Sequence, residues 1–129
     1  MLEVKCAFWK DVIGCSHLNF TDDNGHGTHC AGVIAASANN GKGIAGVAGI
    51  TEGRVKIMAV KVTDKFGLGL FSWFLKGLNY ALAKGVRISS ASLGGRARSA
   101  IGLVERVLRK NKDHLLIAAA GNEGRGVGR

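Results

Sequence analysis

The chain has 129 residues, 47% of them hydrophobic and 21% charged, a composition that suits one folded domain and excludes a disordered tail or a collagen-like repeat. No apolar run reaches the roughly 18 residues of a membrane helix, and charged residues interrupt the N-terminal segment, which excludes a secretory signal peptide in this chain. The net charge is +9, but the basic residues are spread along the chain, which argues against a nucleic-acid interface.

The sequence after residue 20 alternates between the periodicities of helices and strands. In chain order it predicts a small-residue helix over 27–38, a strand over 55–62, a helix over 70–85, a strand over 86–93, a helix over 97–110 and a strand over 115–121. The last of these, LLIAAAG, is apolar throughout and predicts a strand buried on both faces. This order of elements predicts an α/β fold with a parallel sheet and right-handed crossovers.

Two of the predicted strands are followed by polar or glycine-rich segments. Ser92-Leu93-Gly94-Gly95 follows one strand, and Asn122 lies just past the last one. In open α/β sheets, ligands bind beyond the carboxyl ends of the strands. An amide such as that of Asn122 can donate a hydrogen bond there, although an asparagine in this position is also an ordinary turn residue.

The densest polar cluster is Asp22-Asp23-Asn24-Gly25-His26-Gly27-Thr28-His29. A histidine at the start of a helix faces the positive end of the helix dipole, which favours the neutral imidazole that a general base requires. His26 and His29 lie on one face, but no third ligand or His-Glu-x-x-His pattern points to zinc. The chemistry alone leaves open that both histidines are structural.

A second glycine-rich segment, Gly41 to Gly46, fits the pattern Gly-x-Gly-x-x-Gly. A dinucleotide site needs a strand before this pattern and a helix opening inside it. Here a predicted helix precedes it, so the context argues against a nucleotide.

Three motifs, DDNGHGTHCAG, SLGG and AAAGNEG, occur in this order, and together they resemble the subtilisin-like serine proteases. Cys30 in HGTHCAG is similar to the proteinase K branch. The resemblance runs from about residue 12 to 124, so residues 1–129 are interpreted as a partial peptidase domain. It implies a three-layer, parallel-sheet subtilisin-like fold, of which this chain is the N-terminal to central portion.

The resemblance also assigns roles to single residues. His26 matches the catalytic general base, His29 a structural histidine, and Asn122 the asparagine of the oxyanion hole. The expected substrate-binding residues are Ser92, Leu93 and Gly94 in the primary specificity pocket, and Gly67, Leu68 and Gly69 in a second edge strand. Asn39 or Asn40 falls in a loop that binds structural calcium in many relatives; the chemistry itself needs no cofactor.

Two members of the catalytic triad have no match. Relatives carry the aspartate in an Asp-Ser/Thr-Gly motif, which Asp11 does not fit, and Asp22 and Asp23 lie too close to the histidine. The nucleophile belongs to a Gly-Thr-Ser-Met-Ala motif that this sequence lacks. Since a base without a nucleophile cannot form an acyl-enzyme, we expect the isolated chain to be inactive.

The resemblance implies a polypeptide substrate, a propeptide or inhibitor as a protein partner, no membrane, and a secreted or extracellular location. Two other hypotheses stay open at this point. One is a truncated pseudo-protease without catalytic function. The other is a basic α/β module that binds nucleic acid or a nucleotide, which leaves HGTHCAG and AAAGNEG unexplained.

Overall fold

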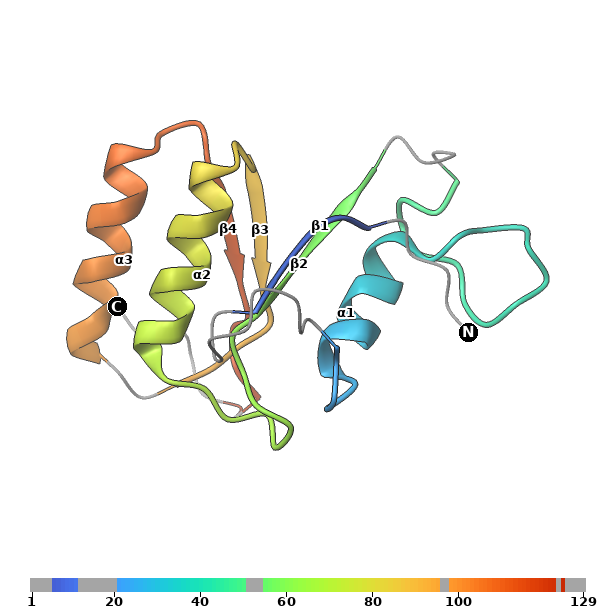
Figure 1. Cartoon of the computed structure of the whole chain (residues 1–129), viewed down its shortest axis with the longest axis horizontal. Helices are drawn as coiled ribbons and strands as arrows, with labels where there is room; N and C mark the ends of the chain where they lie inside the picture. Colours follow the sequence, from blue (N-terminus) through green and yellow to red (C-terminus); the bar gives the residue numbers. More distant parts are fainter. Residues whose placement is uncertain (1–5, 12–20, 51–54, 96–97, 123, 125–129) are drawn as a thin grey trace. The chain divides into compact units, whose positions relative to one another are not determined.

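The computed structural model describes residues 6–11, 21–50, 55–95, 98–122 and 124 (Figure 1). Strands and helices alternate along the chain, as the sequence predicts for an α/β fold. In chain order the elements are β1 (Cys6–Asp11), α1 (His26–Ala35), β2 (Ile57–Lys61), α2 (Phe71–Ala83), β3 (Ile88–Ala91), α3 (Arg98–Lys110) and β4 (Leu115–Ala118).

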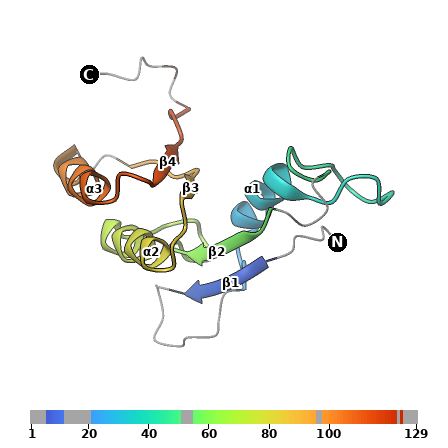
Figure 2. The same cartoon turned by 90° about the horizontal axis from the view of Figure 1, so that it is seen from above.

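The described strands form two parallel pairs, β1 with β2 and β3 with β4 (Figures 1 and 2). A helix connects the two strands of each pair, α1 in the first and α3 in the second. Each half is therefore a β-α-β unit, and parallel strands need such a crossover because a tight turn cannot join them.

The strand β1 was not predicted, because CAFWKD shows neither a clean alternation nor a continuous apolar run. It pairs with β2 from Cys6 opposite Ile57 to Asp11 opposite Lys61, with a register shift between Cys6 and Phe8. Asp11 thus occupies the carboxyl end of β1, level with the last residue of β2.

The small residues after α1 serve a structural purpose. The N–H groups of Gly46, Val47 and Ala48 donate to the carbonyls of Ala36, Val33 and Ile34, at 2.8–3.0 Å, so this segment satisfies the end of the helix. A Cβ on Gly46 would lie 2.4 Å from the backbone nitrogen of Ala36, which only glycine avoids. The segment 41–46 follows a helix and not a strand, in agreement with the argument against a dinucleotide site.

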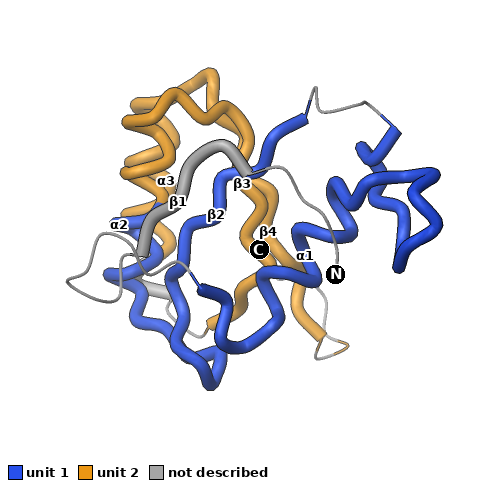
Figure 3. The backbone as a smooth tube through the Cα atoms, turned by 45° about the vertical axis from the view of Figure 1, so that its right-hand side comes forward, with its two compact units in different colours: residues 1–77 blue, residues 78–129 orange. Residues whose placement is uncertain are grey.

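The chain divides into two compact units, residues 1–77 and 78–129 (Figure 3). In the second unit, Leu78 and Ala81 of α2 are buried. The helix α2 ends at Ala83, two residues before Gly85, which has φ 74° and donates its N–H to the carbonyl of Leu82. In the first unit, the apolar residue at the end of α1, Ala36, is 1% exposed.

The prediction that the last strand is buried on both faces is wrong. Leu115 and Ile117 of β4 are 57% and 51% exposed, and Ile88, which pairs with Leu115 on β3, is 63% exposed. Only Leu116 between them is half-buried. An apolar run therefore marks the strand but does not establish that both of its faces are covered. In the described part of the chain, no helix has the length and apolar character needed to cross a membrane.

Candidate active site

His26 is the first residue of α1 and is exposed. The preceding Gly25 has φ 94°, a conformation that glycine adopts without steric cost, and it turns the chain into the helix. The side-chain oxygen of Asn24 accepts the backbone N–H of His26 at 3.3 Å. The structure therefore places the expected base at the N-terminus of a helix.

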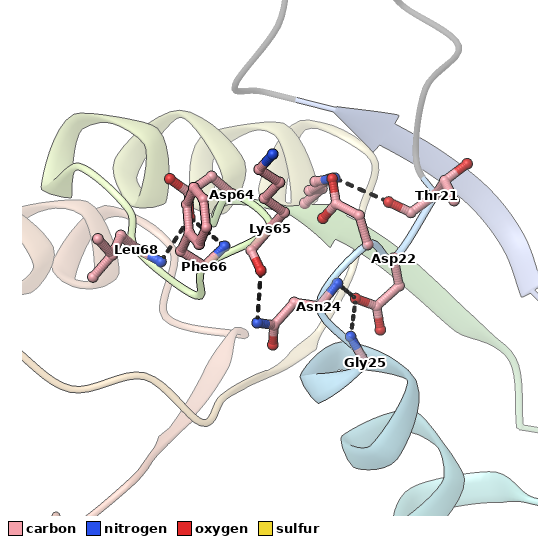
Figure 4. Close-up of polar contacts among 10 residues, drawn as sticks. Thr21, Asp22, Asn24, Gly25, Asp64, Lys65, Phe66 and Leu68 are labelled. Carbon is pink, nitrogen blue, oxygen red and sulfur yellow. Dashed lines mark hydrogen bonds and ion pairs between the residues drawn. The ribbon is translucent and has the colours of Figure 1, made fainter.

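The side chain that secures this helix start is Asp22. Its carboxylate accepts the backbone N–H groups of Asn24 and Gly25 at 3.1 and 2.8 Å (Figure 4). It also accepts the backbone N–H of Thr28 at 2.7 Å and the Thr28 hydroxyl at 2.6 Å. Partial desolvation alone would raise the pKa of Asp22, but these four hydrogen bonds outweigh it and lower the pKa from 3.8 to about 2. The prediction excluded Asp22 as the triad aspartate without recognising this role, which an acidic residue just before a helix could have suggested.

One helical turn after His26 lies the free thiol of Cys30. Its Sγ is 3.8 Å from Nε2 of His26. His29 is exposed, and its backbone N–H makes the ordinary helical bond to Gly25 at 3.0 Å. Within the described ranges, no three His, Cys, Asp or Glu side chains come together as a metal site, so the structure provides no basis for a zinc site at the two histidines.

The expected substrate segment 67–69 follows a closed turn. Oδ1 of Asp64 accepts the N–H groups of Phe66 and Leu68 at 2.9 and 3.0 Å, and the Leu68 carbonyl accepts the Asp64 N–H at 2.8 Å (Figure 4). Gly67 has φ 77°. Residues 67–69 are irregular backbone before α2.

Three contacts join this turn and the end of β2 to the loop before His26. Nδ2 of Asn24 donates to the Lys65 carbonyl at 3.1 Å. Nζ of Lys61 lies 2.7 Å from Oδ2 of Asp23 and donates to the Thr21 carbonyl at 3.0 Å. The loop before His26 and the turn 64–68 therefore lie next to each other, beyond the carboxyl end of β2.

The remaining expected residues lie in the second unit. Ser92, Leu93 and Gly94 follow β3, and Asn122 follows β4. Because the two strands are parallel, and the Ala119 N–H continues their pairing by donating to the Ala91 carbonyl at 3.1 Å, both segments leave the same edge of the sheet. Asn122 is exposed and comes directly after Gly121, which has φ 96°.

The loop expected to hold calcium offers few ligands. Asn39 has φ 57°, and Oδ1 of Asn40 already accepts the Lys42 N–H at 2.9 Å. Calcium takes six to eight oxygen ligands, and its affinity depends on their charge. Residues 37–46 contain no carboxylate and carry a lysine, so the donor set of this loop does not fit calcium.

Comparison with known proteins agrees with the motifs. Residues 9–128 match the Subtilase family. The chain is 44% identical over 102 residues to thermitase of Thermoactinomyces vulgaris, covering 78% of this chain and 35% of thermitase. It is 44% identical over 121 residues to the major intracellular serine protease of Bacillus subtilis (strain 168), covering 84% of this chain and 36% of that protein.

A third relative, the minor extracellular protease Epr of Bacillus subtilis (strain 168), is 40% identical over 109 residues, which are 84% of this chain and 16% of Epr. The chain thus spans about a third or less of the length of these relatives. The match to the family nevertheless covers almost every residue of the chain. The chain belongs to the subtilase family.

Proposed function

We propose that this chain is the part of a subtilisin-like serine endopeptidase that carries the general-base histidine and the oxyanion asparagine, His26 and Asn122. The observation that carries the proposal is the position of His26, within the HGTH motif of a family member, at the N-terminus of α1 and directly after a loop whose Asn24 contacts the turn beyond β2. Ligands of parallel α/β sheets bind beyond the carboxyl ends of the strands.

The reaction is acyl transfer. His26 takes the proton of a serine hydroxyl as the serine attacks the peptide carbonyl, and it then gives that proton to the leaving amine. The amide of Asn122 donates a hydrogen bond to the carbonyl oxygen as negative charge develops on it. The serine and the aspartate that orients the imidazole come from parts of the protease outside the 129 residues.

The rest of the domain completes the three-layer fold. The exposed apolar residues Ile88, Leu115 and Ile117 form one face of the β3–β4 pair, and covering such a face is what a further layer does. The length of the relatives, about three times the matched part, supplies enough chain for this layer.

The substrate is a polypeptide that binds in extended form along residues 67–69 and 92–94. A propeptide or protein inhibitor would occupy the same segments. Relatives named as intracellular and as extracellular both match this chain, so membership of the family does not specify a compartment.

A chimera tests the proposal. Residues 21–124 of this chain replace the aligned segment of thermitase, and the rest of thermitase stays unchanged. We expect hydrolysis of a peptide substrate, and we expect Asn122→Ala to lower kcat about 100- to 1,000-fold, the size known for removing such a donor in a subtilisin.

Thermitase itself is the control for expression and assay. A chimera with the circular dichroism spectrum of thermitase but without peptide hydrolysis would contradict the proposal, because its only altered part is the segment from this chain.

A further inference from the structure

The side chain of Asn24 uses both ends of its amide. Its Oδ1 accepts the N–H of His26 at 3.3 Å, and its Nδ2 donates to the carbonyl of Lys65 at 3.1 Å (Figure 4). Lys65 lies 41 residues after Asn24 in the sequence. One exposed side chain therefore bridges the start of α1 and the turn after β2.

The turn at the far end of this bridge is closed by its own hydrogen bonds. The carboxylate and backbone of Asp64 bind Phe66, Gly67 and Leu68 at 2.8–3.0 Å. The carbonyl of Lys65 lies inside this closed turn, so holding that carbonyl also holds the position of Gly67 and Leu68.

The near end of the bridge is equally well fixed. The backbone N–H of Asn24 donates to Asp22 at 3.1 Å, and Asp22 also binds the first turn of α1 through Gly25 and Thr28. The bridge thus joins two hydrogen-bonded clusters, one around the helix start and one around Asp64, through a single amide.

A second connection between the same regions runs through Lys61, which contacts Asp23 and the Thr21 carbonyl. Its two partners in the loop, Asp23 and Thr21, lie three and five residues before His26. Only the Asn24 amide, among the hydrogen bonds described for this loop, joins the His26 backbone to the turn directly.

We propose that Asn24 is a positioning residue that couples the His26 backbone to the turn 64–68, so that the general base and the substrate segment 67–69 keep one relative geometry. The proposal rests on the proposed function, because that function makes His26 the general base and residues 67–69 a substrate segment. Its physical content, a coupling through one amide, does not depend on catalysis.

The test uses the full 129-residue chain labelled with ¹⁵N. Asp64→Ala opens the turn, and the amide resonance of His26 reports whether the change arrives there. We expect Asp64→Ala to shift the His26 resonance in the parent chain and to leave it unchanged in a chain that already carries Asn24→Asp.

Asn24→Asp is the informative variant because a carboxylate still accepts the His26 N–H but has no N–H to donate to Lys65. This variant distinguishes loss of the contact between Asn24 and Lys65 from a general loss of structure. The His26 amide should keep its hydrogen bond, and only the shift caused by Asp64→Ala should disappear. Asn40→Ala is the matched control, an asparagine of the same unit that accepts the Lys42 N–H, and it should leave the transmission intact.

Two results would overturn the proposal: a His26 resonance that Asp64→Ala leaves unmoved in the parent chain, or an equal shift in the Asn24→Asp background. Neither depends on peptide hydrolysis. An inactive thermitase chimera together with intact coupling would therefore overturn the proposed function but still support the coupling through Asn24.

Discussion

At the scale of single residues, Asp22 is the side chain whose contribution to folding is most sharply defined. It accepts three backbone N–H groups and one hydroxyl around the start of α1. We expect Asp22→Ala to lower the free energy of unfolding by about 1 kcal/mol, the usual cost of losing a side-chain cap. Urea denaturation followed by circular dichroism measures this change, and Asp113→Ala, an exposed carboxylate in the second unit, should leave it unaltered.

The same carboxylate makes the stability of α1 depend on pH. The pKa of Asp22 is lowered to about 2 in the folded chain from 3.8, so its stabilisation is complete above the higher value and is lost as the pH falls toward the lower one. We expect the difference in unfolding free energy between the parent chain and Asp22→Ala to be constant above about pH 5 and to shrink toward zero near pH 2. A difference that stays constant down to pH 2 would contradict the assigned hydrogen bonds.

Residue roles could be predicted from the sequence where they lie in a contiguous motif. His26 and Asn122 stand inside HGTH and AAAGNEG, so their positions at a helix start and beyond a strand end could be anticipated. The bridge from Asn24 to Lys65 could not, because it joins segments distant in the sequence and depends on how β2 and α1 meet. A backbone carbonyl can accept a hydrogen bond whatever the residue type, so the sequence does not indicate which residue is the acceptor.

At the scale of elements, the contact between α1 and residues 46–48 carries a prediction about glycine. Gly46 is buried against the backbone of Ala35 and Ala36, and a Cβ there would lie 2.5 and 2.4 Å from their nitrogens. We expect Gly46→Ala to cost about 1–3 kcal/mol, because the segment must move away from the helix end that it caps. Thermal unfolding of the two proteins measures the loss.

Gly102 provides the matched control. It lies in the middle of α3, and an added Cβ would meet nothing within 4 Å outside the helix itself. Gly102→Ala should therefore stabilise the chain by up to about 1 kcal/mol, since alanine is the better helix former. Equal effects of the two substitutions would contradict the close packing at Gly46.

Most elements were predictable because their periodicity is strong. The helices α2 and α3 and the strands β2 and β3 lie within the predicted ranges, because apolar residues recur at helical spacing or follow one another in short β-branched runs. The strand β1 escaped prediction because its pairing with β2, not its own pattern, makes it a strand. The exposure of β4 could not be predicted either, because the sequence shows that the strand is apolar but not which elements cover it.

At the scale of the whole molecule, the chain exposes large apolar side chains on a strand pair. Ile88, Leu115 and Ile117 are each more than half exposed on one face of the β3–β4 pair. We expect the isolated chain to bind the hydrophobic dye ANS, and the double substitution Ile88→Ser and Ile117→Ser to reduce that fluorescence. Val47→Ser, at a residue that is 87% exposed in the first unit, is the control and should change the signal less.

The residues proposed for catalysis and substrate binding lie in two parts of the chain. His26 and residues 67–69 lie in the first unit, and Ser92 to Gly94 and Asn122 lie in the second. Each unit places its residues at the carboxyl end of a parallel strand pair, which is where an α/β protein of this family would need them. The α/β fold class was therefore accessible from the sequence, whereas the hydrogen bonds around the start of α1 and the turn 64–68 were not.

The most direct measurement compares His26→Ala with His29→Ala in the thermitase chimera, at equal amounts of folded protein. We expect His26→Ala to lower kcat by about a millionfold, as loss of the catalytic histidine does in a subtilisin, and His29→Ala to retain most of the activity. The two histidines share one helix turn and both are exposed, so each substitution is the control for the other. Comparable activity of the chimera and its His26→Ala variant would contradict the assignment of His26 as the general base.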